Sequence, residues 1–419
     1  MRVLWITESP SKYKAEKTGY NGRGWIASLQ SIIETSPEIN QLGIAFSHPT
    51  DSTKLQEGNV TYYPIKKTET KKGVSWVINN WMKRNIHENE IIHLKEIIRD
   101  FKPDLIQIFG TESWLTCVVE LTDIPTVVHI QGILQPYINT YLPVGITNYD
   151  LMKSNWARFI KGYGAWHDKI DFEKSGSKEY EYFKHISFFM GRTDWDKSIS
   201  AFLSPSSVYF HVDEVLRDAF YIAPQWKYLK TKKIIITSTL SDSPYKGLDL
   251  VIKTARLLLK EGIDFKWRII GLNDYSTNVQ ILETKFKLKC QSVNIDLLGV
   301  KKAEEIIDLL LETTIFVHTS YIDNSPNSLC EALLIGVPAI STNVGGISSL
   351  VNDGIDGLLI PSNDPYLLAS KITQLTNDEK YMISISKQAR DKAQKRHSKE
   401  DVQSQLINTY KYLFQLNKK

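Results

Sequence analysis

The chain has 419 residues, of which 42% are hydrophobic and 23% are charged. This length favours two domains over a single core, and this composition is typical of a globular protein rather than a disordered or fibrous one. The formal net charge of +4 is small for the length. Nucleic-acid binding requires a concentrated basic face, so we expect no nucleic-acid partner.

The cysteines and the N-terminal segment indicate the compartment. Cys117, Cys290 and Cys330 lie far apart, and no Cys/His spacing predicts a metal site or a disulfide framework. The first residues, MRVLWITESP, have neither the basic segment nor the cleavage site of a signal peptide. No stretch has the ~20 consecutive apolar residues of a membrane helix. We therefore expect a cytoplasmic protein that at most contacts a membrane surface.

In the first half of the chain, short apolar runs alternate with amphipathic segments. Strands are expected at residues 2–6, 42–46, 60–65, 104–109, 126–130 and 187–190. Apolar residues at helical spacing predict helices at 25–34 and 90–101. The segment 149–184, rich in Lys and aromatic residues, does not fit this alternation.

The alternation begins again at Lys233, after a polar and basic connection at 225–232. Strands are expected at 233–237, 266–270, 295–298, 315–318, 339–341 and 357–360, and a helix at 248–260, with Gly262 as its C-terminal cap. Strands alternating with helices predict an α/β fold with two doubly wound, Rossmann-like domains. We expect these domains to be residues 1–228 and 229–399, and ligands to bind at the carboxyl ends of the strands.

The segment YIDNSPNSLCEALLIG, residues 321–336, follows an expected strand. We predict Ser325 as the N-cap of a helix, Pro326 as its first residue and Gly336 as its end. The backbone N–H groups of this loop and of the first helical turn, together with the helix dipole, suit an anion such as a diphosphate. We therefore take Asn324, Ser325, Pro326 and Asn327 as candidate residues that bind the nucleotide sugar. Glu331 lies inside the helix, where its carboxylate can accept hydrogen bonds from sugar hydroxyls.

This segment resembles the signature of the retaining glycosyltransferases of family 4, which have the GT-B fold. Their motif is two acidic residues separated by seven others, and here the pair is Asp323 and Glu331. The run EALLIGVPAISTNVGGISSLVNDGIDGLLIP also resembles the family, including its Gly345–Gly346 loop. The resemblance implies that Glu331 binds the ribose of the donor and that Asp323 lies near the donor sugar and the reacting carbon. It further implies two domains that face each other across a cleft, with a final helix, 400–419, packed back on the first domain.

Lys246 and Gly247 directly precede the expected helix at 248–260. A lysine near a helix N-terminus is either a phosphate ligand or, more commonly, a solvated surface residue. The family resemblance favours the first interpretation and implies that Lys246 stabilises the charge of the departing diphosphate. The family often has an arginine a few residues earlier, where this chain has Thr239, Leu240 and Ser241.

Other candidate residues follow strands in both halves. The resemblance places Gly299 and Val300 against the nucleobase, and Gly22 and Gly24 in a loop that approaches the donor phosphates or the acceptor. Gln131, or alternatively His129, would face the donor sugar, although a lone histidine inside a strand is more often a core residue. Arg192 follows a strand and is a further candidate. Glu214 and Arg217, three residues apart, are predicted to form an ion pair on one helix.

The resemblance thus implies a hexosyltransferase-type enzyme that moves a sugar from a UDP- or GDP-linked donor to a glycan or lipid-linked acceptor, retains the α configuration and serves polysaccharide biosynthesis. No cofactor and no metal are expected. The basic, aromatic stretch near Lys153 and Trp166 is either a packed helix pair or a contact with the inner surface of the cytoplasmic membrane. Alternative functions are a sugar-nucleotide epimerase and an inactive sugar-nucleotide-binding partner protein.

Overall fold

The computed structural model describes residues 1–13, 24–49, 53–67, 76–78, 81, 87–228, 230 and 233–417. The chain divides into two compact units. The first comprises Met1–Ile138, Ala157–Val215 and Ser398–Lys419, and the second Asn139–Trp156 and Leu216–His397. The main segment of the second unit begins at Leu216, earlier than the expected residue 229, because α9 (Asp218–Ile222) contacts α12 (Ala303–Leu311) and α13 (Asn327–Ile335). Residues 139–156, which were expected in the first domain, also belong to the second unit, because α5 (Asn148–Ser154) packs on α11 (Thr277–Phe286).

The first unit is built on an eight-stranded sheet with the order β3-β4-β2-β1-β5-β6-β7-β8. Its strands are β1 (Arg2–Thr7), β2 (Gln41–His48), β3 (Leu55–Glu57), β4 (Val60–Lys66), β5 (Leu105–Phe109), β6 (Thr126–His129), β7 (Phe188–Gly191) and β8 (Val208–His211). All neighbouring pairs are parallel except β3 with β4. Every strand predicted in this half is confirmed, whereas the edge strands β3 and β8 were missed.

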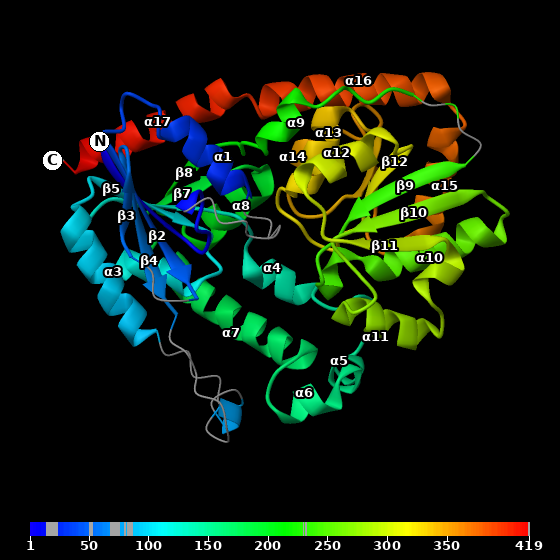
Figure 1. The fold of residues 1–419 in the computed structure, drawn as a ribbon, viewed down its shortest axis with the longest axis horizontal. Coiled ribbons are helices and arrows are strands. Elements are labelled where there is room, and N and C mark those ends of the chain that lie inside the picture. The colour runs from blue at the N-terminus through cyan, green and yellow to red at the C-terminus, as the bar shows by residue number, and fades with distance from the viewer. Residues whose placement is uncertain are drawn as a thin grey trace. The chain divides into compact units, whose positions relative to one another are not determined.

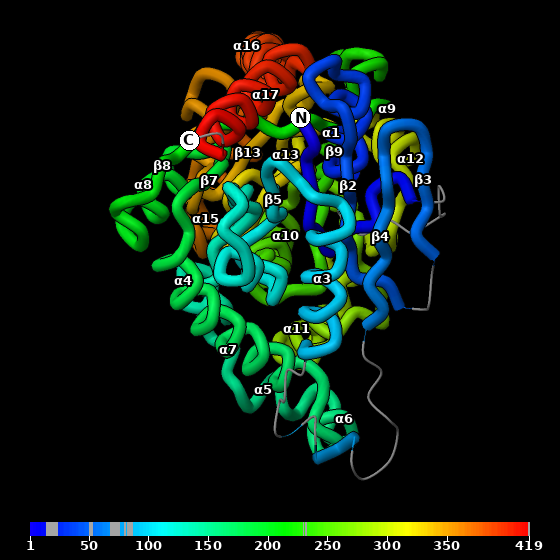
Figure 2. The backbone as a smooth tube through the Cα atoms, turned by 90° about the vertical axis from the view of Figure 1, so that its left-hand side faces the viewer, coloured from blue at the N-terminus to red at the C-terminus, as the bar shows by residue number. Residues whose placement is uncertain are grey.

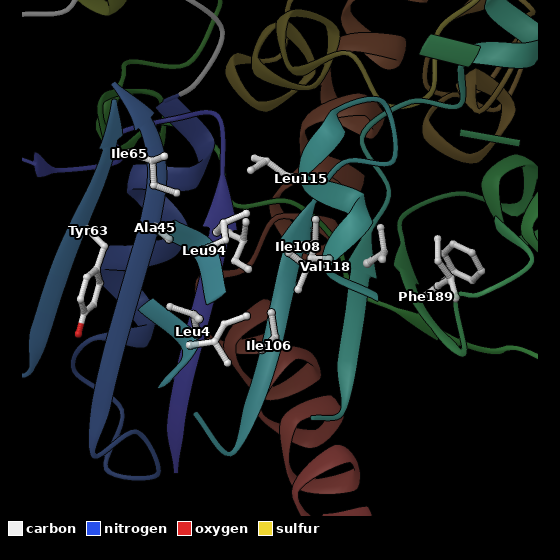
Figure 3. Packing of buried hydrophobic residues seen from close by; sticks show 14 of the residues in the cluster. Leu4, Ala45, Tyr63, Ile65, Leu94, Ile106, Ile108, Leu115, Val118 and Phe189 are labelled. Atoms are coloured by element: carbon white, nitrogen blue, oxygen red, sulfur yellow. The ribbon is translucent and has the colours of Figure 1, made fainter. Parts of the chain in front are cut away.

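The described helices of the first unit include α1 (Gly24–Ile33), α3 (Glu88–Phe101), the 3₁₀ helix η2 (Trp114–Glu120), α4 (Leu134–Asn139), α6 (Trp156–Ile160), α7 (Ala165–Phe183), α8 (Asp194–Leu203) and α17 (Lys399–Leu416). Aliphatic side chains of β1, β5 and β6 pack with α3 and η2 in a continuous core, of which Figure 3 shows Leu4, Leu94 and Ile108. Each such side chain contributes about 1.5–3 kcal/mol relative to leaving it in water.

The last helix, α17, packs on the first unit, beside α1 and β5 (Figures 1 and 2). Its Tyr410 is fully buried, and the Tyr410 hydroxyl accepts a hydrogen bond from Trp5 Nε1 at 2.8 Å and donates one to Gln107 Oε1. A buried hydroxyl that is satisfied in both roles avoids the cost of an unpaired polar group. These contacts fix the C-terminal segment to the two central strands of the first sheet.

The second unit is built on a fully parallel six-stranded sheet with the order β11-β10-β9-β12-β13-β14. Its strands are β9 (Ile234–Thr239), β10 (Phe265–Ile270), β11 (Ile295–Gly299), β12 (Ile315–His318), β13 (Ala339–Thr342) and β14 (Leu358–Ile360), and all six confirm predictions. This is the 3-2-1-4-5-6 order of the doubly wound fold. Figure 1 shows β9, β10 and β11 lying side by side.

The second unit contains α-helices and 3₁₀ turns among its described residues, several of which cover the sheet. They are α5 (Asn148–Ser154), α9, the 3₁₀ turns η3 (Pro244–Lys246) and η4 (Cys290–Val293), α10 (Leu248–Lys260), α11 (Thr277–Phe286), α12, α13, α14 (Ile347–Leu350), α15 (Pro365–Thr376) and α16 (Glu379–Arg396). The predicted helix at 248–260 is confirmed as α10, whose apolar face is buried. Among the described residues, no helix is both long and apolar enough to span a membrane.

Candidate functional site

The strand order of the second sheet locates a candidate site. The chain proceeds outward from β9 through β10 to β11, and then returns to the other side of β9 with β12. In doubly wound sheets, ligands bind outside the carboxyl ends of the strands where the order reverses, because the following loops diverge there. The loops after β9 and β12 carry Lys246 and Asp323, the two residues that the sequence proposed for catalysis.

The structure brings these two residues together. Lys246 Nζ lies 2.6 Å from Asp323 Oδ2, which also accepts a hydrogen bond from Ser320 Oγ at 3.0 Å and lies 3.1 Å from His318 Nε2. Asp323 is only 6% exposed. Burial alone would raise the pKa of its carboxyl, but the charge of Lys246 and the hydrogen bond from His318 outweigh burial and hold that pKa well below its usual range. The pair is therefore ionised.

Glycines allow the surrounding loops to approach closely. Gly247 has a φ of +79°, and a Cβ at this position would lie 2.0 Å from the carbonyl oxygen of Thr319, in the loop after β12. A Cβ on Gly345, which has a φ of +53°, would lie 1.9 Å from the carbonyl oxygen of Asp323, and Gly346 N donates to that oxygen at 3.0 Å. The loops after β9, β12 and β13 are thus interlocked around Asp323, at positions that only glycine fits.

The helix after β12 begins later than predicted. Pro326, with φ −71° and ψ 115°, is the N-cap of α13, and no side chain caps the helix. The prediction of Ser325 as the cap was therefore wrong, because the extended ψ of Pro326 leaves it outside the helix. The predicted end at Gly336 is confirmed by its left-handed conformation. Asn324 is buried, and Asn327 begins the helix, whose first N–H groups lack intrahelical acceptors.

Glu331 makes a contact that the sequence did not reveal. Arg217 Nε donates to Glu331 Oε1 and Arg217 Nη2 donates to Oε2, both at 2.7 Å. Glu331 is 2% exposed, and burial raises the pKa of its carboxyl while Arg217 opposes the rise. The predicted helical pair of Glu214 with Arg217 was wrong, because neither residue lies in a helix and Glu214 Oε2 instead lies 4.0 Å from Arg192 Nε. No sequence signal connects Arg217 to Glu331, which lie 114 residues apart.

The loop after β11, which the sequence analysis assigned to the nucleobase, is open around Gly299 and exposed at Val300. Gly299 has a φ of +68°, and a Cβ there would meet no atom within 4 Å. Val300 is 57% exposed. An exposed apolar side chain beside a glycine turn can pack against the face of a planar ring, which supports the assignment of this loop to a base but does not identify the base.

The remaining predicted residues belong to the first unit. Gly24 begins α1, while Gly22 lies outside the described residues. Gln131 follows β6 and is half-buried. Arg192 follows β7, is buried, and places its guanidinium 4.3 Å from the ring centre of Trp25.

His129 is a core residue. It is fully buried, and its Nδ1 lies 3.2 Å from Gln107 Nε2, which joins it to the network that anchors α17. Burial and, to a lesser extent, the charge of Arg192 hold the pKa of His129 well below its ordinary value, so the ring is neutral. Of the two alternatives after β6, these contacts favour Gln131 over His129 as the residue that meets a ligand.

Two buried carboxyl groups of the first unit were missed by the sequence reasoning. Glu112 follows β5, and Glu179 lies on α7, where it accepts hydrogen bonds from Thr111 Oγ1 at 2.5 Å and Leu134 N at 2.7 Å. Burial raises the pKa of Glu112 to about 7 and that of Glu179 to about 8, and the proximity of Glu112 contributes to the second shift. At neutral pH Glu179 is therefore largely protonated, and Glu112 is protonated in about half of the molecules.

A groove of about 760 Å³ lies between α5 and α11 in the second unit, and none of the predicted site residues lines it. Its rim carries Lys153, Lys285, Lys287 and Lys289. Lys285 is paired with Asp150 at 3.0 Å and Lys289 with Glu283 at 2.6 Å. Since four cations face two anions, the groove carries a positive charge.

Comparison with known proteins finds a family match within the second unit. Residues 223–392 match the family Glycosyl transferases group 1. WcaL of Escherichia coli strain K12, whose name places it in colanic acid biosynthesis, is 29% identical over 172 residues, which are 39% of this chain and 40% of WcaL. AmsK, the amylovoran biosynthesis glycosyltransferase of Erwinia amylovora, is 30% identical over 159 residues, 36% of this chain and 37% of AmsK. The chain thus matches about two fifths of the length of these relatives.

Solved structures resemble the chain over nearly all of its length. Sucrose-phosphate synthase from Thermosynechococcus elongatus has a TM-score of 0.74 at 12% identity and covers 99% of this chain and 100% of its own. HepE of Anabaena, solved with UDP and glucose, has a TM-score of 0.65 at 13% identity, and the match covers 98% of this chain and 99% of HepE. At such identities the likeness establishes the fold, which confirms two parallel-sheet α/β domains of the GT-B type.

Proposed function

We propose that the protein is a glycosyltransferase of polysaccharide biosynthesis, because residues 223–392 match the Glycosyl transferases group 1 family and because the chain is similar to WcaL and AmsK. It would move a hexosyl group from a nucleotide sugar, UDP- or GDP-linked, to a glycan or lipid-linked acceptor. The observation that carries this proposal is the ionised Lys246–Asp323 pair at the point where the strand order of the second sheet reverses.

The second unit offers a distinct group for each part of the donor. Lys246 and the free N–H groups at the start of α13 would bind the diphosphate, because both present positive charge. Glu331 would accept hydrogen bonds from the ribose hydroxyls, and the loop at Gly299 and Val300 would contact the base. Since Glu331 is 2% exposed, the chain around it must open when the donor enters.

Transfer would proceed by cleavage of the bond between the sugar C1 and the diphosphate oxygen while the acceptor oxygen bonds to C1 on the same face. The hydroxyl proton of the acceptor would pass to the departing diphosphate, and the α configuration would be retained. Lys246 stabilises the negative charge that develops on the leaving group. Within the part of the chain that the structure describes, the side-chain contacts of Asp323 are to Oδ2, so we propose that Oδ1 meets a hydroxyl of the donor sugar.

We propose that this chemistry needs no divalent metal. The charge of Lys246 and the dipole of α13 act where a metal ion would otherwise neutralise the diphosphate. Activity should therefore survive EDTA. Loss of activity with EDTA and recovery with Mg²⁺ would contradict this part of the proposal alone.

The basic groove between α5 and α11 supports the acceptor side of the proposal. A lipid-linked acceptor would bring the enzyme into peripheral contact with the inner surface of the cytoplasmic membrane, where lysines are attracted to anionic headgroups. The three cysteines, Cys117, Cys290 and Cys330, are buried as thiols, as in proteins of a reducing compartment. We propose a cytoplasmic location with such peripheral contact.

The first test is a thermal-shift screen of the protein against UDP, GDP, ADP and their common sugars, with Mg²⁺ and with EDTA. A ligand that binds the folded state raises the melting temperature. We expect one nucleotide to raise the melting temperature of the wild type but not that of Glu331→Ala. The reference for each protein is its own melting temperature without nucleotide. No shift with any nucleotide at millimolar concentration would overturn the donor-site assignment.

The second test is transfer itself. The nucleotide sugar selected by the screen should be hydrolysed slowly without an acceptor, and faster with one, and the anomeric configuration of the product should be α by nuclear magnetic resonance. A protein that binds the nucleotide sugar but neither hydrolyses nor transfers it would be a binding partner rather than an enzyme.

A further inference from the structure

The contact between Arg217 and Glu331 assigns a role to a residue outside the recognised motif. Glu331 is buried on α13, and a buried carboxylate is costly unless it is paired and hydrogen-bonded. Among the contacts of the described residues, Arg217 supplies the only hydrogen bonds to this carboxylate. The two bonds of equal length fix both the charge and the plane of the carboxylate.

The local structure holds Arg217 in place before any ligand arrives. Its guanidinium lies 4.7 Å from the ring centre of Phe220, which is buried in α9. The adjacent backbone is anchored as well, because Leu216 N donates to the Tyr221 hydroxyl at 3.0 Å and that hydroxyl donates to the carbonyl oxygen of His397 at 2.7 Å. Arg217 is therefore a preorganised cation rather than a mobile surface side chain.

We infer that Arg217 is a positioning residue of the donor site, which keeps Glu331 ionised and oriented so that it binds the ribose of the nucleotide sugar. This inference rests on the proposed function. Each carboxylate oxygen has two acceptor positions, and Arg217 occupies one on each. One acceptor position per oxygen remains, which matches the two neighbouring hydroxyls of a ribose.

Lysine cannot fully replace arginine in this role. The planar guanidinium binds both oxygens at once, whereas an ammonium group is a point charge that fixes no plane. Arg217→Lys should therefore keep Glu331 ionised but orient it poorly. Arg217→Met should leave burial unopposed, so that the pKa of Glu331 rises further and the carboxyl becomes neutral near neutral pH.

The sign of the pH dependence follows from this shift. A neutral carboxyl is a weaker acceptor than a carboxylate, so Arg217→Met should bind the donor weakly at low pH and regain affinity as the pH rises and Glu331 ionises. The wild type should show a weaker recovery over the same range, because Arg217 limits the rise that burial causes in the pKa of Glu331. A residue that only stabilises the fold would not produce this difference.

The experiment measures the dissociation constant of UDP-glucose, or of GDP-mannose if the thermal screen selects guanine, by calorimetry between about pH 6 and about pH 8.5. For Arg217→Met we expect affinity at least about tenfold below wild type at the lowest pH, and within about threefold of it at the highest. Arg217→Lys should lose about threefold to tenfold with little pH dependence.

The matched control is Arg268→Ala, which removes another Arg–Glu contact of the second unit, 2.9 Å between Arg268 Nη1 and Glu312 Oε2, away from the candidate site. Its affinity should equal that of the wild type at every pH. Each variant is first shown by its melting curve to be folded at the assay temperature. If Arg217→Met does not fold, the role of Arg217 is tested by comparing the affinity of Arg217→Lys for the donor with that of the wild type.

Two results would overturn the inference while leaving the proposed function intact. The first is unchanged affinity of Arg217→Met or Arg217→Lys when Glu331→Ala has lost binding. The second is a loss of affinity in Arg217→Met that is the same at every pH, since it would mean that Arg217 contacts the donor itself. Absence of binding to the wild type would instead contradict the proposed function.

Discussion

The two sheets share a topology but differ in the chemistry at the point where their strand order reverses. In the second sheet this point lies between β9 and β12, and it holds the ionised pair Lys246–Asp323. In the first sheet it lies between β1 and β5, and the loop after β5 carries Glu112, which interacts with Glu179 of α7. Burial raises the pKa of both glutamates to about 7 and about 8.

The difference shows that topology places a site whereas side chains decide what it binds. A lysine and a helix N-terminus attract an anion such as a diphosphate. Two protonated carboxyl groups bear no charge and can both donate and accept hydrogen bonds, as the hydroxyls of a sugar do. We therefore expect charge-changing substitutions to act strongly in the second unit, and pH to act on the first.

The largest effect should come from Glu331→Ala. This variant loses the proposed ribose contact and leaves Arg217 without its carboxylate, and breaking a buried ion pair costs ~3–5 kcal/mol. The melting temperature without nucleotide should fall, which differential scanning calorimetry measures. Glu312→Ala, which removes the carboxylate of a solvent-exposed pair with Arg268, should change it little. If the melting temperature of Glu331→Ala equals that of the wild type, the contact between Arg217 and Glu331 contributes no stability.

Lys246→Met should be nearly as severe, but in catalysis rather than in stability. Removing a group that stabilises charge in the transition state lowers kcat by about 10²–10³-fold. Initial rates of sugar transfer measure this loss. The matched control is Lys253→Met, because Lys253 lies on α10, pairs with Asp249 at 2.8 Å and is not at the candidate site. Equal rates for the two variants would remove Lys246 from the mechanism.

Asp323→Asn should have a smaller effect. The amide retains the shape of the side chain but loses the charge that holds Lys246, so kcat should fall by about tenfold or more, equivalent to ~1.4 kcal/mol. In the wild type, Asp323 stays ionised across the assay range because its pKa is held well below the usual value. Protonation of Asp323 should therefore not slow the wild-type enzyme between about pH 8 and about pH 5.5. The pH profiles of the wild type and Asp323→Asn should have the same shape over this range. A decline in the wild-type rate that Asp323→Asn lacks would contradict the assignment of this pair as permanently charged.

The smallest effect concerns the first unit. A carboxyl whose pKa is higher in the folded than in the unfolded protein binds its proton more tightly when folded, so stability falls as the pH rises from the unfolded toward the folded pKa. For Glu179 this range runs from 4.5 to about 8. Glu179→Gln, which is always neutral, should lessen this decline by roughly 1 kcal/mol for each pH unit of the range.

The measurement for Glu179→Gln is a set of denaturant unfolding curves across this pH range. Glu181→Gln is the control, because Glu181 is exposed on the same helix. Parallel curves for the wild type and Glu179→Gln would show that Glu179 is not protonated in the folded protein.

The sequence determined the fold because the signals for it are local. Runs of apolar residues predicted the strands of both sheets, and the helical spacing with the following Gly262 predicted α10. The two strands that were missed, β3 and β8, are at sheet edges and largely exposed or half-buried, with burial patterns that lack a continuous apolar run. Edge strands pair on one side only, so their sequences carry a weaker signal.

The sequence also proposed Lys246, Asp323 and Glu331 as site residues, because the segments around them resemble those of a known enzyme family. It could not supply their partners. His318 and Ser320 bind Asp323 because a short loop turns back on its strand. Arg217 reaches Glu331 because chain segments 114 residues apart meet in the fold. Local periodicity fixes which residues are helix or strand, whereas charge pairing depends on side-chain positions that only tertiary packing brings together.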